Sequence, residues 1–245
     1  MLKKNTRLGV NIDHIATLRN ARDDGYIELG HVAKILKRLK VHSITVHLRE
    51  DRRHIKDNDV RLLKKLNILP INLEMAPTSE MLNFCKEVKP FACCIVPEKR
   101  QEKTTEGGLN LKKNYGKLRD IIHELKRLNI RISLFIEPCE KQVEIASELK
   151  ADAVELHTGK YAELFEKKKY HNELKQIENV SKFCYNIGME CHAGHGLNLK
   201  NVKKIIAIKH IAELNIGYFI VAQSIFNGIG NVITDFLDLI DGEKQ

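Results

Sequence analysis

The stretch from Arg131 to Gly159 reads RISLFIEPCEKQVEIASELKADAVELHTG, and its pattern decides the fold class. A β-rich run over Arg131–Glu137 is followed by a helical pattern over Val143–Leu149 and a second β-rich run over Ala153–Gly159. Strand, helix and strand in this order predict two parallel strands joined by a right-handed crossover.

The same alternation extends along the whole chain. The other β-rich runs are Leu8–Asp13, Ser43–Leu48, Pro70–Met75, Phe91–Pro97, Met189–Gly194 and Ile211–Gly217. The other helical patterns are Val32–Leu39, Val60–Leu66, Met81–Val88, Leu118–Leu128, Val202–Ile208 and Ile225–Ile240. Eight strand–helix units in 245 residues, with no low-complexity linker, predict one α/β domain over residues 1–245 that folds as a (β/α)8 TIM barrel with extra helices. An open doubly wound sheet is the alternative architecture.

Composition and charge narrow the function classes. The net charge of +9 comes from 41 Lys plus Arg against 32 Asp plus Glu, and the lysines are spread over many predicted helices. Without a basic stripe or a binding motif, we expect no nucleic-acid partner. No apolar run reaches the roughly 18 residues that a membrane span needs, and no signal-like stretch follows the N-terminus, so we expect a cytoplasmic protein. The six cysteines form no C-x-x-C pair, which predicts reduced, packed thiols and no metal site.

Two connections are longer than ordinary barrel loops. Glu98–Asn110 contains Gly107 and Gly108 and is a candidate lid. Tyr161–Asn172 is rich in Glu and Lys and is interpreted as an extra helix or a surface for a partner.

Polar side chains recur at the predicted carboxyl ends of the strands, where (β/α)8 enzymes form their active sites. Residues two apart on a strand face the same side. The residues concerned are Asn11, Asp13, His47, Arg49, Asn72, Glu74, Glu155, His157, His192, His195, Asn215 and Gly217. Each alone has a structural explanation, since a histidine can be part of the framework and a carboxylate such as Asp13 can cap a helix. Their coincidence on several strands favours a catalytic site, because burying several charges without function is costly.

The chemistry follows from the residue types. Glu74 lies between apolar neighbours that should raise its pKa, and His47 and His195 suit proton transfer near neutral pH. Gly194–Gly196 and Gly217 give backbone N–H groups room to approach an anion. The arginines with forked donors for phosphate are Arg22, Arg49, Arg52 and Arg53. Together they predict carbon chemistry on phosphorylated substrates.

Eight segments match one enzyme family in order and spacing. They are Gly9–Arg22, Thr45–Ile55, Asn72–Ala76, Val96–Glu102, Thr104–Leu109, Glu155–Gly159, Ala193–Leu197 and Glu213–Gly217. Through them nearly the whole chain resembles the pyridoxine 5′-phosphate synthase family. The resemblance implies condensation of 3-amino-2-oxopropyl phosphate with 1-deoxy-D-xylulose 5-phosphate to pyridoxine 5′-phosphate, inorganic phosphate and water, without metal or organic cofactor. It also implies a homo-octamer.

The resemblance assigns roles to individual residues. His47 and Glu74 would accept protons. His195 would donate one, and Glu155 would stabilise the transition state. The residues expected at the aminoketone phosphate are Asn11, Arg22, Gly196, Gly217 and Tyr218. Those expected at the deoxyxylulose phosphate are Asp13, His14, Arg49, His54 and Thr104, the last of which lies in the candidate lid.

The sequence departs from the family pattern in four places. His192 replaces a usual Asn, Tyr218 replaces a common His, and Ala222–Ser224 replaces a turn that usually begins with Gly. Asp23–Gly30 lacks the prolines often found there. The changes at Tyr218 and Ala222–Ser224 lie near the expected phosphate site, where backbone N–H groups would make side-chain identity less important.

Three other functions are compatible with parts of the pattern. A Schiff-base aldolase would need an inward lysine at a strand end, for which Lys99 and Lys160 are poor candidates. A metal-dependent hydrolase could use His192 and His195, but their spacing lacks an obvious third ligand. A nucleic-acid-binding barrel would use the basic surface and show salt-sensitive binding without turnover.

Overall fold

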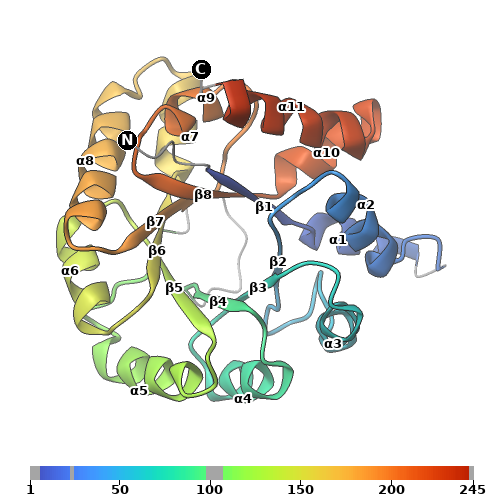
Figure 1. Cartoon of the computed structure of the whole chain (residues 1–245), viewed down its shortest axis with the longest axis horizontal. Coiled ribbons are helices and arrows are strands. Elements are labelled where there is room, and N and C mark those ends of the chain that lie inside the picture. Colours follow the sequence, from blue (N-terminus) through green and yellow to red (C-terminus); the bar gives the residue numbers. More distant parts are fainter. Residues whose placement is uncertain (1–5, 23–24, 98–106, 243–245) are drawn as a thin grey trace.

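A computed structural model describes residues 6–22, 25–97 and 107–242. In this part of the chain eight parallel strands close into a barrel in sequential order (Figure 1). The strands are β1 (Arg7–Asn11), β2 (Ser43–His47), β3 (Ile71–Met75), β4 (Ala92–Ile95), β5 (Arg131–Ile136), β6 (Ala153–His157), β7 (Glu190–Gly194) and β8 (Ile211–Ile216). The ring closes because β1 pairs with β8, so the open-sheet alternative is wrong and the predicted barrel is confirmed.

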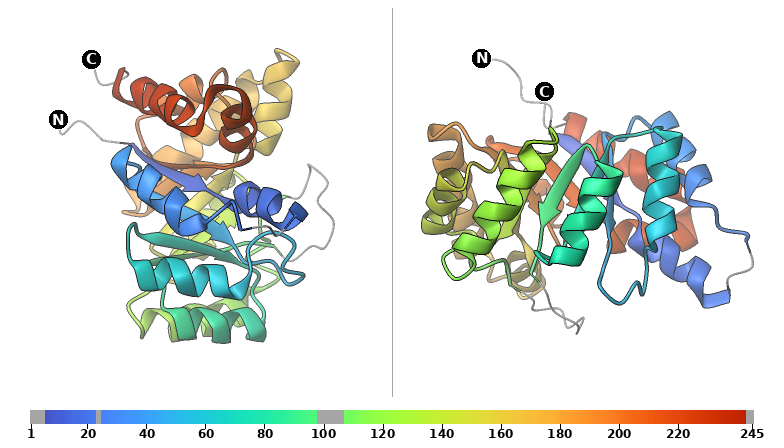
Figure 2. Two further views of the ribbon diagram at one scale, coloured as in Figure 1. Left: turned by 90° about the vertical axis from the view of Figure 1, so that its right-hand side faces the viewer. Right: turned by 90° about the horizontal axis from the view of Figure 1, so that it is seen from below.

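Helices form an outer layer around this ring, lying along the strands (Figures 1 and 2). They are α1 (Asp13–Arg22), α2 (Leu29–Arg38), α3 (Asp57–Leu66), α4 (Ser79–Val88), α5 (Tyr115–Lys126), α6 (Glu140–Glu148), α7 (Gly159–Glu166), α8 (His171–Asn186), α9 (Val202–Ile206), α10 (Tyr218–Asn227) and α11 (Ile229–Gly242). Within the described ranges, none of these helices is long and apolar enough to cross a bilayer.

Three helical segments differ from the sequence prediction. α1 begins at Asp13, where the strand was expected to continue. The pattern over Ile225–Ile240 is divided at Gly228, whose φ of 75° ends α10 before α11 begins. The extra helix expected over Tyr161–Asn172 is α7, and the chain then continues into the sixteen-residue α8.

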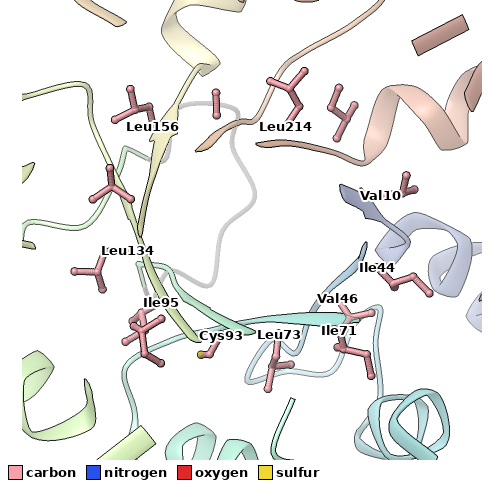
Figure 3. Close-up of a cluster of buried hydrophobic side chains, with 14 of the residues drawn as sticks. Val10, Ile44, Val46, Ile71, Leu73, Cys93, Ile95, Leu134, Leu156 and Leu214 are labelled. Atoms are coloured by element: carbon pink, nitrogen blue, oxygen red, sulfur yellow. The ribbon is translucent and has the colours of Figure 1, made fainter. Parts of the chain in front are cut away.

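The hydrophobic core lies between the strands and the helices, outside the barrel. Figure 3 shows Val10, Leu73, Leu134, Leu156 and Leu214 pointing away from the barrel axis. All five side chains have no solvent exposure. Because burial of a Leu or Val side chain stabilises a protein by about 1.5–3 kcal/mol, this outer layer supplies most of the folding free energy.

The barrel interior is polar and is crossed by side-chain hydrogen bonds. Thr45 on β2 donates through its hydroxyl to Asn215 Oδ1 on β8 at 3.1 Å. Asn215 Nδ2 in turn donates to Glu155 Oε2 on β6 at 2.7 Å. These strands are not neighbours, and glycines occupy the strands between them. A Cβ on Gly9 would lie 2.2 Å from Asn215 Oδ1, and one on Gly194 would lie 2.3 Å from Glu155 Oε1. The two glycines therefore make room for the bonds that hold the interior together.

Charged side chains fill the interior at the end where the strands begin. Arg7 Nε donates to Glu213 Oε2 at 2.7 Å, and Arg7 also bonds to Glu190. His192 Nε2 lies 2.7 Å from Glu190 Oε1. This ion-paired layer neutralises its own charges, and it leaves the carboxyl ends of the strands as the place where the remaining ionisable groups gather.

Candidate active site

His47 and Glu74 face each other at the mouth of the barrel, where β2 and β3 end. His47 Nδ1 lies 3.6 Å from Glu74 Oε2, slightly beyond hydrogen-bond range. Burial lowers the pKa of His47 to about 3, and the charges of Arg49 and His54 act in the same direction. Burial, together with the carboxylates of Glu155 and Asp13, raises the pKa of Glu74 well above its ordinary value. The pair thus places an imidazole whose pKa is lowered beside a carboxyl group whose pKa is raised.

Asp13 joins three elements beside this pair. Its carboxylate accepts the backbone N–H of His47 at 2.9 Å and an N–H of the Asn11 side chain at 3.3 Å. Asn11 Oδ1 accepts the backbone N–H of Asp13 at 2.9 Å. Burial raises the pKa of Asp13 to about 6, although these hydrogen bonds act against the rise. Asp13 was expected at the end of a strand, but it is the first residue of α1. Its carboxylate still bonds to the side chain of Asn11 and the backbone of His47.

Glu155 lies deeper in the barrel, on β6. Only 3% of the residue is exposed, and burial raises the pKa of its carboxyl group to about 7. The positive charge of His192 and the hydrogen bond from Asn215 limit this rise. Because its negative charge raises the pKa of Glu74, the two carboxyl groups titrate as neighbours in one site.

Arg49 contributes positive charge to the whole mouth. Its guanidinium acts to lower the pKa values of four groups from different segments, although burial raises two of them overall. The four groups are Asp13, His47, Glu74 and His195. An arginine in this position can bind a phosphate or stabilise a carboxylate at the reaction centre.

A row of aromatic rings borders the mouth on the side of α1. The ring of His14 lies 5.3 Å from that of His54 and 5.1 Å from that of Tyr218. His54 is buried, and its Nδ1 lies 2.7 Å from the hydroxyl of Thr17. Tyr218, the first residue of α10, is 70% exposed and is free to cover a ligand from outside.

His195 and Gly196 form a tight turn after β7. Both have positive φ, 80° for His195 and 76° for Gly196, and the first is unusual for a residue with a side chain. The Thr158 hydroxyl lies 2.6 Å from His195 O and 2.7 Å from Gly194 O and stabilises this turn. The pKa of the His195 imidazole is lowered to about 4 by burial, by His157 and by Arg49. Gly217 directly follows β8 and is crowded by Asn11, since a Cβ on Gly217 would lie 2.9 Å from the Cβ of Asn11.

Two predicted residues, Arg22 and Lys160, lie away from this cluster, and two others are not among the described residues. Arg22 is exposed at the far end of α1, about 14 Å along the helix from Asp13. Thr104 lies outside the described residues, as does most of the lid candidate. Lys160 points to solvent and pairs with Glu173 at 2.7 Å, which argues against an aldolase lysine there, and Lys99 is not among the described residues.

The metal alternative gains no support from the geometry. His192 belongs to the paired layer inside the barrel, whereas His195 stands at the mouth. In the described ranges no three His, Cys, Asp or Glu side chains come together as a metal site.

Three polar residues at the mouth were not assigned a role from the sequence. Glu137 follows β5, and its Oε1 lies 2.8 Å from His157 Nδ1 at the end of β6. His157 is the second of these residues, and Thr158, which follows β6, is the third. Glu137 is two residues beyond Phe135 on an inward-facing position, so the spacing used for the other strands predicts it equally well.

A closed parallel barrel with coupled carboxyl groups, imidazoles and an arginine at its mouth defines an enzyme that works by proton transfer. Comparison with known proteins narrows the class. A model of the family described as pyridoxal phosphate biosynthesis protein PdxJ matches residues 8–242, and the chain belongs to this family. The recognition made from the sequence is thereby confirmed.

Two curated relatives are named pyridoxine 5′-phosphate synthase. The protein of Ehrlichia chaffeensis is 49% identical over 92% of this chain and 93% of its own length. That of Blochmanniella pennsylvanica is 46% identical over 98% of this chain and 99% of its own length. Among solved structures, orotidine 5′-monophosphate decarboxylase from Methanocaldococcus jannaschii has a TM-score of 0.64 at 12% identity, covering 96% of this chain and 99% of that one. The last comparison concerns the fold alone.

Proposed function

We propose that this chain is a pyridoxine 5′-phosphate synthase. It would condense 3-amino-2-oxopropyl phosphate with 1-deoxy-D-xylulose 5-phosphate and release pyridoxine 5′-phosphate, inorganic phosphate and water. The observation that carries the proposal is the approach of His47 Nδ1 to Glu74 Oε2 at 3.6 Å, near the carboxyl groups of Glu155 and Asp13, in a chain of this family. Imine formation, dehydration, phosphate loss and ring closure each move protons at a different atom, so several acid–base groups around one pocket are required.

The proton-transfer roles follow from charge at neutral pH. His47 has a lowered pKa and is neutral, so it can accept a proton. Glu74 can accept one after it has lost its own to solvent. His195, whose pKa of about 4 leaves it neutral at neutral pH, would donate a proton to a leaving oxygen after taking one up in an earlier step. Glu155 has a pKa of about 7, so near neutral pH its carboxyl group can be neutral or negatively charged. The negative form would stabilise positive charge that develops on the substrate nitrogen. The substrate amine is the nucleophile, so no enzyme lysine is needed.

Substrate binding would use two neighbouring sets of residues at the mouth. Gly196 after β7 and Gly217 after β8 would offer backbone N–H groups to the aminoketone phosphate, with Asn11 and Tyr218 next to Gly217. Arg22 and Thr104 remain predictions from the resemblance. The deoxyxylulose phosphate would be held by Asp13, His14, Arg49 and His54, which adjoin the first set through the Asn11–Asp13 hydrogen bonds and the contact of His14 with Tyr218.

The test supplies both phosphorylated substrates and measures pyridoxine 5′-phosphate and released phosphate, with each substrate omitted in turn. We expect product from the parent and a loss of at least about 10²-fold for Glu74→Gln, as removal of a general base gives. Glu163→Gln is the matched control, because Glu163 forms an exposed pair with Lys167 on α7. Lack of product from the parent would overturn the function, and full activity of Glu74→Gln would overturn the role of Glu74.

We further propose that the chain assembles as a homo-octamer. Tyr26, Ile225 and Phe226 are 90%, 67% and 81% exposed, and an apolar groove lies among α1, α2 and α10. Apolar patches of this kind mark protein–protein contacts, and a second copy would cover this one. Native mass spectrometry should give eight times 28.1 kDa, and Ile225→Lys should reduce the assembly. A monomeric parent would refute the assembly.

The remaining proposals concern location and partners. All six cysteines are free thiols, which suits a reducing cytoplasm. The enzyme should need neither nucleic acid nor membrane, and it should work without an added metal or organic cofactor. Activity that survives dialysis against a chelator would support the last point, and activity lost on chelation and restored by a metal would refute it.

A further inference from the structure

His157 and His195 stand side by side at the mouth of the barrel, and only one of them has a role in the proposed reaction. Their ring centroids are 4.9 Å apart and their planes are inclined by 55°. His157 is 5% exposed, whereas His195 reaches solvent. A Cβ on Gly159 would lie 2.6 Å from His157 Nε2 and 3.0 Å from His195 Cδ2. The two rings therefore meet over the space that this glycine leaves open.

Glu137 fixes the orientation of His157. Its Oε1 lies 2.8 Å from His157 Nδ1 and accepts the backbone N–H of Gly108 at 2.8 Å. Burial tends to raise the pKa of Glu137, but the hydrogen bonds from His157 and Gly108 outweigh burial and hold that pKa below its ordinary value. The carboxylate is thus ionised and can only accept, so Nδ1 of His157 carries a hydrogen and Nε2 is turned away from Glu137.

The other ring nitrogen of His157 has no structural explanation. Nε2 is buried and has no hydrogen-bond partner within the described ranges. Leaving such an atom unpaired costs about 1–3 kcal/mol, which an apolar side chain at this position would avoid. The nitrogen lies beside the ring of His195, next to the space that Gly159 leaves open. A functional demand at His195 accounts for both the burial and the missing partner.

We propose that Glu137 and His157 are a pair of positioning residues for His195, holding its ring at the mouth and balancing its charge. The inference rests on the proposed function, in which His195 is the proton donor. The arrangement follows the same logic as other carboxylate–histidine pairs, in which the carboxylate orients an imidazole and stabilises positive charge nearby. Here the orientation is passed on to a second imidazole through ring contact.

Glu137 and His157 have opposite effects on the pKa of His195. His157 on β6 and Arg49 after β2 lower the pKa of His195, while Glu137 after β5 raises it. Lys160 and Glu155 face the pair from α7 and from within the barrel. Removing His157 should therefore raise the pKa of His195, and removing the charge of Glu137 in addition should lower it again.

Structural loosening makes a different prediction. Burial is the main reason that His195 titrates low, so a damaged site would expose the ring and raise its pKa. The double variant would then move further in the same direction as the single one. The sign of the second step separates tuning by charge from damage.

The test measures how fast diethyl pyrocarbonate modifies His195 between pH 3 and 8 in the substrate-free protein. Only neutral imidazole reacts, and peptide fragmentation separates His195 from His192. For His157→Asn we expect the midpoint to rise by at least about 0.5 pH unit. For His157→Asn with Glu137→Gln we expect it to return toward the parent value. An unchanged midpoint in the first variant, or a further rise in the second, would overturn the proposal.

Kinetics on the two substrates provide the second readout. For His157→Asn we expect kcat to fall about 10-fold, because the ring of His195 loses the contact that positions it, while KM changes less than about 3-fold. Unchanged kcat would overturn the proposal. Glu163→Gln should leave both midpoint and kcat unchanged. The modification experiment needs no turnover, so a parent that shows the expected midpoints but forms no product would refute the proposed function and leave the positioning pair intact.

Discussion

Replacing Glu155 by glutamine measures what a buried catalytic carboxyl group costs the fold. Glu155 is 3% exposed, and burial raises its pKa from 4.5 to about 7. At about 1.4 kcal/mol for each pH unit, the ionised form destabilises the folded chain by about 3 kcal/mol. Glutamine has the same shape as the protonated acid, and its carbonyl oxygen can still accept the hydrogen bond from Asn215.

The effect has a definite sign and pH window. Because the folded-state pKa is raised above that of the unfolded chain, the stability that the protonated carboxyl group provides is complete below about pH 4.5. It is lost as the pH rises through about 7. Glu155→Gln should therefore be more stable than the parent by about 3 kcal/mol at pH 8.5 and by less than about 1 kcal/mol at pH 5. For a chain of this length the gain at pH 8.5 corresponds to a rise in Tm of about 6 °C or more.

Thermal and urea unfolding at both pH values, at one protein concentration, test this prediction. Product formation by the same variant should fall about 10²-fold, since a group that stabilises the transition state is gone. Glu163→Gln is the control, because its carboxylate is exposed and its loss should give no stabilisation at either pH. A stability difference of the same size at pH 5 and pH 8.5 would refute the reasoning, because the gain would then not come from ionisation.

Three further substitutions test the supports of the site. Gly194→Ala would place a Cβ 2.3 Å from Glu155 Oε1, so we expect a loss of about 1–3 kcal/mol in urea unfolding together with reduced product formation; a fully stable variant would contradict the crowding. Thr158→Val removes the hydroxyl that bonds to the carbonyls of Gly194 and His195, and it should lower stability by about 1–2 kcal/mol and kcat with it, whereas unchanged kcat would show that the turn holds itself. Arg19→Met breaks a forked ion pair with the buried carboxylate of Asp59 on α3, with N···O distances of 2.5 and 2.8 Å. We expect it to lower the free energy of unfolding by about 3 kcal/mol, and a parent-like Tm would contradict this.

The strands could be predicted from the sequence because the side chains on their outward faces are nearly all apolar. The eight predicted runs overlap the eight strands and differ only at their ends. Two helices were missed for a physical reason. α1 buries only Asp13 and Ala16, and α8 buries polar residues such as Glu173 and Ser181 along with its apolar ones. α1 therefore shows no clear apolar stripe, whereas α8 buries Ile177, Val180 and Cys184 at helical spacing, in a stripe that also contains these polar residues.

The candidate site could be predicted as far as strand parity reaches. Parity places His47, Glu74 and Glu155 inside the barrel, and the positions of His47 and Glu74 at the ends of β2 and β3 bring these two to the mouth. It says nothing of contacts between residues on different loops, such as the ring of His14 beside Tyr218. Nor does it indicate which inward glycine makes room for which polar side chain. These features depend on the closure of the barrel, which joins residues far apart in the chain.

The division between an apolar outer layer and a polar interior explains how this barrel can hold so many ionisable groups. The outward faces of the strands pack against helices and bury their apolar side chains whatever lies inside. The interior adds cohesion through bonds between strands that are not neighbours, as from Thr45 through Asn215 to Glu155. Each such bond fixes a group at the mouth and stabilises the ring that carries it. Since the free energy of folding comes mainly from the outer layer, raised carboxyl pKa values inside the barrel can persist without unfolding it.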